Sequence, residues 1–194
     1  MKTLINLIKM LLGRSTKVVD PPKPVLNPPA FDPKLLEAWL RRAIDKKGPP
    51  PFGYEPDEGM AHGERFIKDV MDLYGYKEME SFIPGTFNQM ADFMAKSPHW
   101  KLLKDDDGKS HYETAANWAA QGCLIMAIQK NDGLGLACVL APDNNIIFSN
   151  KWLKTVPMVA YVGKKNFYGK ALNWAFENEP DLYLLISLPT GTVQ

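Results

Sequence analysis

Residues 123–149, CLIMAIQKNDGLGLACVLAPDNNIIFS, decide the fold class of this chain. Three short apolar runs, CLIMAIQ, LACVLA and NIIFS, are separated by segments rich in Gly, Asn, Asp and Pro. Apolar runs of this length, bounded by turn residues, predict antiparallel β-strands. The runs MVAYV at 158–162 and LYLLISL at 182–188 predict two more strands, and YGKALNWAFENE at 168–179 predicts a helix between them.

The first part of the domain has the periodicity of helices instead. Asp32 is a suitable N-cap for a helix that has Pro33 at its first position and ends before KKGPPP. Apolar residues at helical spacing predict a second helix over about 63–74, which Gly75 terminates.

Two further helices are predicted from their first residues. Thr86 with Gln89 three positions later is typical of a capping box, and Ser110 with Glu113 repeats that spacing. Helices followed by a mostly antiparallel sheet indicate an α+β fold, with the N-terminal helices packed on the sheet.

Composition allows a single sizeable core and limits the partners. The 194 residues are 45% hydrophobic, and 23 Lys and Arg side chains nearly balance 22 Asp and Glu side chains. A chain without an excess of positive charge is not expected to bind nucleic acid. No phosphate loop, zinc-binding pair or hydrolase elbow is present, so we expect no cofactor and no metal.

The N-terminal region is predicted to be an appendage of the domain. Residues 1–19 have the spacing of an amphipathic helix, residues 20–33 form a Pro-rich linker, and residues 34–194 form the domain. The apolar stripe is predicted to bind a partner and consists of Leu4, Ile5, Leu7, Ile8, Leu11 and Leu12. A protein partner or a homo-oligomer is favoured over a membrane surface, because few cations flank the stripe. A secretory signal is less favoured, because Lys and Asn interrupt the apolar run.

Two cysteines, Cys123 and Cys138, raise the question of chemistry. A thiol in such a position can be a nucleophile, a ligand or a small buried hydrophobic group. Both lie within apolar runs, which favours free buried thiols over a disulfide, although pairing across neighbouring strands stays open. Among the three histidines, His62 lies at the start of the second predicted helix, where the helix dipole would favour an anion such as a thiolate.

Residues 59–188 resemble a divergent member of the papain-like cell-wall hydrolases, the NlpC/P60 and CHAP amidase group. In these enzymes the nucleophile opens a helix with a pattern like Cys-Asn-x-Phe-Val-x-x-Val, and the base begins a strand like Gly-His-Val-x-Val-Val. Here GERFIKDV at 63–70 matches the first pattern and GLACVL at 135–140 matches the second. The later stretch VPMVAYVGKKNFYGKALNWAF resembles the strand and helix that follow the base. The resemblance implies a papain-like α+β fold.

The same resemblance implies that the catalytic dyad is degenerate. The nucleophile position holds Gly63 and the base position holds Leu136, and neither can do the chemistry. An exchanged dyad is the alternative: Cys138, two residues beyond Leu136 on the same strand face, would point toward His62.

The resulting functional hypothesis is a non-catalytic pseudo-amidase scaffold or binding domain. It would dock through its N-terminal helix to a larger assembly, such as a phage particle or a contractile injection apparatus. The alternatives are an active cysteine amidase or endopeptidase that uses Cys138 or Cys123, and a module that binds peptidoglycan without cutting it. A virion or secretion-associated assembly is the favoured location.

Overall fold

Helices cover both faces of one antiparallel sheet in the computed structural model, which describes residues 26–45, 54, 61–76, 86–106 and 108–189. The amphipathic helix predicted for 1–19 and the first part of the linker, 20–25, lie outside these residues. The helices are α2 (Pro33–Ile44), α3 (Ala61–Leu73), α4 (Phe87–Lys96) and α5 (His111–Ala120), with a short 3-10 turn, η2 (Leu172–Trp174).

The sheet follows the order β1-β7-β2-β3-β5-β4, with β6 paired to β5 outside this path. Every pairing is antiparallel. The strands are β1 (Trp100–Leu102), β2 (Ile125–Gln129), β3 (Leu136–Leu140), β4 (Ile146–Ser149), β5 (Lys154–Tyr161), β6 (Phe167–Ala171) and β7 (Asp181–Leu185). The α+β class predicted from the sequence is confirmed.

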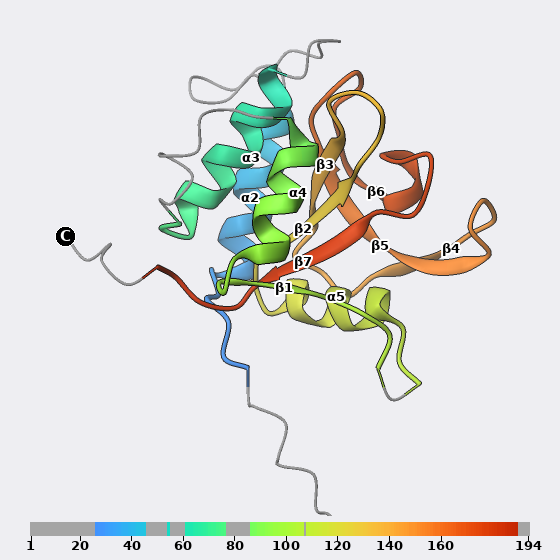
Figure 1. Ribbon diagram of the computed structural model, residues 1–194, viewed down its shortest axis with the longest axis horizontal. Coiled ribbons are helices and arrows are strands. Elements are labelled where there is room, and N and C mark those ends of the chain that lie inside the picture. The colour runs from blue at the N-terminus through green and yellow to red at the C-terminus, as the bar shows by residue number, and fades with distance from the viewer. Residues whose placement is uncertain (1–25, 46–53, 55–60, 77–85, 107, 190–194) are drawn as a thin grey trace, which may run out of the picture.

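The two faces of the sheet support two separate apolar clusters. Side chains alternate along each strand, so Ala137 and Val139 belong to one cluster while Cys138 and Leu140 belong to the other. Helices α2, α3 and α4 cover the first cluster, and α5 and η2 cover the second, on the opposite side of the sheet (Figure 1). The central strand β2 is buried along its whole length because both faces are covered.

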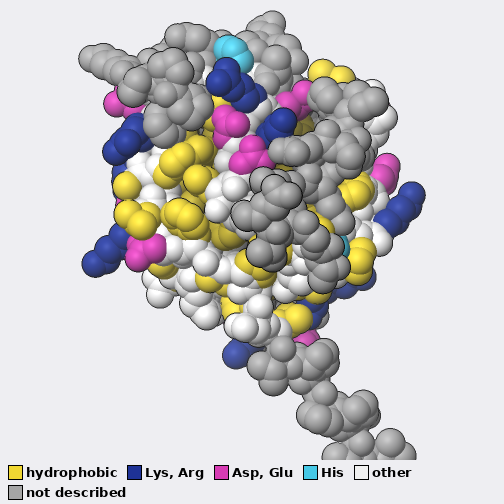
Figure 2. Space-filling view, turned by 90° about the vertical axis from the view of Figure 1, so that its left-hand side faces the viewer, with side chains coloured by type: hydrophobic (Ala, Val, Ile, Leu, Met, Phe, Trp, Pro, Cys, Tyr) yellow, Lys and Arg dark blue, Asp and Glu magenta, His cyan; other side chains and the backbone are white. Residues whose placement is uncertain are grey.

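The helical layer is amphipathic. Its inner side supplies the first cluster, while the outer side in Figure 2 intersperses side chains of both charge signs with apolar ones, without a patch of one sign.

The predicted helix starts agree with the structure. The Asp32 carboxylate accepts hydrogen bonds from the amides of Lys34 and Leu35, and Thr86 and Gln89 form both halves of a capping box. Ser110 caps α5 by accepting a hydrogen bond from the Tyr112 amide. Each cap satisfies amides that the helix itself leaves without a partner.

The helix predicted over 168–179 is wrong. Residues 167–171 form β6, which pairs with β5 through Tyr161↔Phe167 and Met158↔Ala171, and only Leu172–Trp174 retain a helical turn. The apolar residues that produced the helical pattern, among them Ala171 and Leu172, are buried in the second cluster from this irregular backbone. Pairing with β5 therefore overrides the local periodicity. The short strand β1 was missed because it has only three residues.

Residues 26–31, which belong to the part of the Pro-rich segment that the structure describes, lie against the domain. Pro28 is buried, Ala30 forms a bridge with Cys123, and the Phe31 amide donates to the Gly122 carbonyl at 2.9 Å. Gly122 has φ +81°, and a Cβ there would lie 1.8 Å from the Phe31 carbonyl oxygen, so only glycine allows this contact. Residues 26–31 therefore pack on the domain and are not a free spacer.

Candidate functional site

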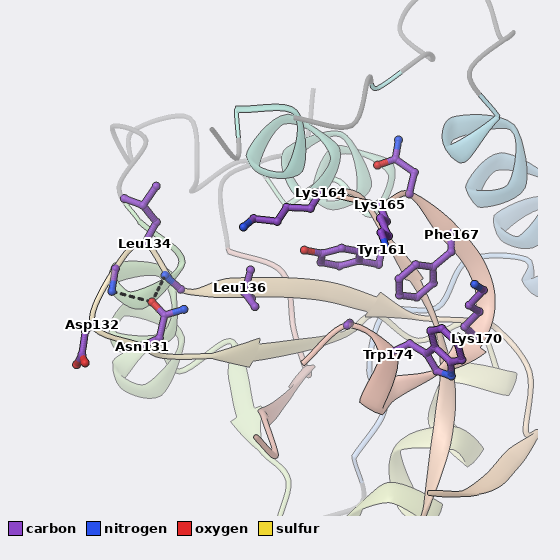
Figure 3. Close-up of a pocket in the computed structure, with 14 residues that line it drawn as sticks. Asn131, Asp132, Leu134, Leu136, Tyr161, Lys164, Lys165, Phe167, Lys170 and Trp174 are labelled. Carbon is purple, nitrogen blue, oxygen red and sulfur yellow. Dashed lines mark hydrogen bonds between the residues drawn. The ribbon is translucent and has the colours of Figure 1, made fainter. Parts of the chain in front are cut away.

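An open groove with a volume of about 1070 Å³ lies at the edge of the second cluster. Its two rims are the loop before β3, residues 131–136, and the turn between β5 and β6, residues 164–167 (Figure 3). Tyr161 from β5 lies between the rims, and Lys170 and Trp174 form one end. A concave site of this size, with apolar walls and a few polar groups, is typical of ligand binding.

The first rim is held rigidly on α4 by two asparagines. Asn88 Nδ2 donates to the carbonyls of Asn131 at 2.8 Å and Gly133 at 2.9 Å, and Asn88 Oδ1 accepts from the Asn131 amide at 3.1 Å. Asn131 Oδ1 in turn accepts from the amides of Gly133 and Gly135. Gly135 has φ +77°, and a Cβ there would lie 2.6 Å from Asn88 Oδ1. This rim is therefore organised before any ligand binds.

The second rim is tied to the helical layer through Asn166. Its Oδ1 accepts from the Gly163 amide at 3.1 Å, and its Nδ2 donates to the Tyr54 carbonyl at 2.5 Å. Tyr54 is buried against Phe66, and its hydroxyl donates to the Asp69 carboxylate. The turn is therefore fixed by contacts across the molecule.

Positive charge dominates the groove. Lys164, Lys165 and Lys170 line it, and among the described lining residues Asp132 is the single acidic one. Lys170 Nζ lies 4.5 Å from the centroid of the Trp174 ring, which fixes the cation over an aromatic face. The Trp174 side chain is 66% exposed, which is unusual for this residue type. The groove thus combines cations with an accessible aromatic surface.

The floor of the groove contributes a neutral hydroxyl and apolar rings. The Tyr161 and Phe167 rings pack with centroids 5.2 Å apart. The Tyr161 hydroxyl is protonated at neutral pH, and burial raises its pKa further above the ordinary value of 10.0. Together with the lysines, these groups suit a ligand that has both anionic and apolar parts.

Both thiols are buried and free. Cys138 has no exposed surface and Cys123 is 4% exposed. Burial raises the pKa of Cys123 to about 11 and that of Cys138 well above its usual value, because a thiolate would lose its hydration. Thiols in this environment are poor nucleophiles.

The predicted exchanged dyad is wrong. Cys138 belongs to the second cluster, beneath α5, whereas α3, which carries His62, covers the opposite face of the sheet. The strand alternation that places Ala137 and Val139 toward α3 directs Cys138 away from it.

The two positions aligned with the amidase dyad contact different parts of the molecule. Gly63, in the first turn of α3, is buried, and a Cβ built there would lie 3.0 Å from the Val162 carbonyl oxygen and 3.6 Å from the Phe87 ring. Leu136 packs against the second cluster and lines the groove. Glycine at 63 therefore has a packing reason of its own.

The other two histidines and two of the tryptophans have structural roles. His99 Nδ1 lies 2.8 Å from Ser187 Oγ, and His111 Nδ1 lies 2.7 Å from an Asp105 carboxylate oxygen. Trp100 is buried in the first cluster, and Trp118 packs against the second.

Sequence reasoning missed the groove lysines and Trp174. The sequence feature that could have indicated this site is the pair of lysines in the Gly-Lys-Lys-Asn turn at 163–166, directly after an apolar run. Lys170 and Trp174 were assigned to a helix, which hid their relation to that turn.

No metal cluster of three or more His, Cys, Asp or Glu side chains occurs among the described residues. The described helices also include none with the length and apolar character to cross a bilayer. Comparison of the chain with protein families and with curated proteins gives no significant match.

Proposed function

We propose that this chain is a non-catalytic binding domain with a pseudo-amidase scaffold, and that its groove binds a peptide with free carboxylates. The charge and shape of the groove carry the proposal. The described lining residues include three lysines and one aspartate, and the two rims are fixed by Asn88 and Asn166 before binding. A carboxylate gains most from such preorganised cations.

The resemblance to cell-wall amidases supports a particular class of peptide. Stem peptides of the cell wall are the substrates implied by that resemblance, and they carry free carboxylates. The exposed Trp174 ring, with Lys170 over it, provides an apolar surface beside a cation. A module that binds such peptides without cutting them is consistent with both features.

Three properties favour binding over thiol chemistry. The thiols are buried with raised pKa values, Cys138 faces away from α3, and a side chain at position 63 would crowd the Val162 carbonyl. A nucleophilic cysteine needs a lowered pKa and access to its substrate.

Docking to a larger assembly, such as a phage particle or an injection apparatus, is the second part of the proposal. The amphipathic pattern of residues 1–19 supports it, because an apolar stripe gains stability when a partner covers it. The groove would then be exposed on the surface of the assembled particle and available to its ligand.

The experiment is a calorimetric titration of the full chain with a soluble cell-wall stem peptide. We expect the affinity for the peptide to fall at least tenfold in Lys165→Glu. A peptide carboxylate that contacts this position loses a cation and meets a negative charge instead. The matched control is Lys101→Glu, which makes the same charge change at an exposed site on β1. A peptide with amidated carboxylates should bind weakly to every variant.

Three results would contradict the proposal. Equal affinity of the two lysine variants, or no binding by any of them, would exclude the groove as a carboxylate site. Cleavage of the peptide during the titration, detected by mass spectrometry, would show that the domain is an enzyme.

A further inference from the structure

Strand β6 contains a β-bulge directly before Lys170. Tyr168 pairs with Ala160 of β5, and the next pair joins Lys170 to Val159, which leaves Gly169 as an extra residue on β6. Gly169 has φ +70°, a backbone conformation that favours glycine and is typical of one class of bulge. The regular alternation of side chains between the two faces of the sheet is therefore interrupted at this residue.

The bulge directs Lys170 to the side of the sheet that carries the groove. In a regular strand, residues 168 and 170 would share one face, because side chains alternate with a period of two. Tyr168 packs on the first cluster, whereas Val159, which lies opposite Lys170, belongs to the second. Lys170 therefore lies on the same face as Phe167, and both line the groove. Bulges beside functional sites often redirect one side chain in this way.

Two aromatic rings hold the Lys170 ammonium group at one end of the groove. Its Nζ lies 4.5 Å from the centroid of the Trp174 ring and 5.6 Å from that of the Phe167 ring. Both distances are within the reach of a cation–π interaction, which is about 6 Å. Figure 3 shows these three side chains together, while the Lys164 ammonium points away from them. The rings therefore favour one position for this cation.

The Lys170 ammonium has no carboxylate partner among the described residues. The ammonium groups of Lys130 and Lys154, in contrast, form ion pairs with Asp92 and Glu179. Lys170 is also exposed, so that a ligand in the groove can reach it. A positioned and accessible cation of this kind is suited to an anionic group of a ligand.

We propose that Lys170 and Trp174 form a subsite for the C-terminal residue of a peptide, with a free carboxylate and an apolar side chain. The proposal rests on the proposed function of the groove and states which part of a peptide binds at this end. Lys170 pairs with the carboxylate. The Trp174 ring is 66% exposed and lies beside the ammonium, so it contacts the apolar side chain. A C-terminal residue matches this pair, because its carboxylate and its side chain are attached to one Cα.

The test is an NMR titration of the isotope-labelled full chain with N-acetylphenylalanine, which has one carboxylate and one apolar side chain. The chain has five tryptophans, and the indole signal of Trp174 is identified by its absence in Trp174→Leu. We expect this signal to shift during the titration, with a dissociation constant in the millimolar range for so small a ligand. N-acetylphenylalanine amide lacks the negative charge and should bind about tenfold more weakly.

Variants of Lys170 separate the subsite from the general positive charge of the groove. Lys170→Met should weaken the binding of N-acetylphenylalanine about tenfold, while Lys170→Arg, which keeps a cation that can lie over an aromatic ring, should retain it. The matched control is Lys164→Met, which makes the same change on the second rim and should leave the affinity unchanged.

Three results would overturn the subsite. These are equal affinity for the acid and the amide, equal loss of affinity in the Lys170 and Lys164 variants, and a Trp174 signal that does not move. The probe is not a cell-wall peptide, so its titration can succeed where that of the stem peptide fails, and the reverse. Failure of the subsite is therefore distinguished from failure of the proposed function.

Discussion

The reactivity of the two thiols is the most direct check on the proposal that neither cysteine acts as a nucleophile. An ordinary thiol with a pKa of 9.0 is about 10% thiolate at pH 8, whereas Cys123, with a pKa of about 11, is about 0.1% thiolate. Alkylation of Cys123 in the folded protein should therefore be about a hundredfold slower at pH 8, because the thiolate reacts. The rate should rise about tenfold per pH unit until about pH 11, and Cys138 should react more slowly still.

The assay is labelling with iodoacetamide under native conditions, read for each cysteine by mass spectrometry. Ala95→Cys supplies an internal standard, since position 95 is exposed on α4. Labelling of Cys138 near pH 6 at a rate comparable to that of the standard, slowed by His62→Ala, would refute the argument. Such a result would reveal an activated thiolate and favour a cysteine amidase.

The raised pKa of Cys123 also predicts that the folded protein loses stability at alkaline pH. The folded state keeps the Cys123 thiol protonated up to about pH 11, while the unfolded chain releases that proton near pH 9. Above pH 9 the unfolded state binds fewer protons, so the free energy of unfolding falls as pH rises from 9 to 11. Urea titrations of the wild type and Cys123→Ala should show a smaller decline across this range in the variant.

Three further results are expected. The double variant Gly63→Cys with Leu136→His restores the two residue types of the amidase dyad, and we expect that it does not cleave cell-wall peptides. Its Tm should fall by about 2–4 °C for each kcal/mol that crowding against the Val162 carbonyl costs the folded state. Measurable peptide release would contradict this. Leu153→Gly should raise the Tm by about 2–4 °C in calorimetry, because Leu153 has φ +54° and glycine removes roughly 1 kcal/mol of strain. A lower Tm would show that the left-handed backbone is not strained. Deletion of residues 1–19 should abolish co-purification with an assembly partner and leave the Tm unchanged. A truncated chain that still co-purifies would exclude the docking helix.

Local signals predicted the elements whose ends are set by nearby atoms. Asp32 and Thr86 satisfy amides two or three residues away, so their helix starts were evident from the sequence. The burial of Cys123 and Cys138 was also evident, because each lies in an apolar run between turn residues. These features depend on contacts within a few positions of the chain.

The segment 168–179 shows where local signals fail. Its apolar spacing is helical, yet pairing with β5 makes part of it a strand, and Gly169 with φ +70° permits the bend. Backbone pairing with the neighbouring strand outweighs the small differences in intrinsic propensity. The placement of Lys170 and Trp174 in the groove followed from that pairing.

The sequence by itself determined the α+β class, the capped helices and the burial of both thiols, because periodicity and capping are properties of short segments. Tertiary structure alone decided that Cys138 faces α5 while His62 lies on the helix over the other face. It also brought the Asn131 loop and the Lys164 turn together as two rims of one groove. Such placements depend on which strands pair and which face each helix covers, and these are set by the packing of the whole chain.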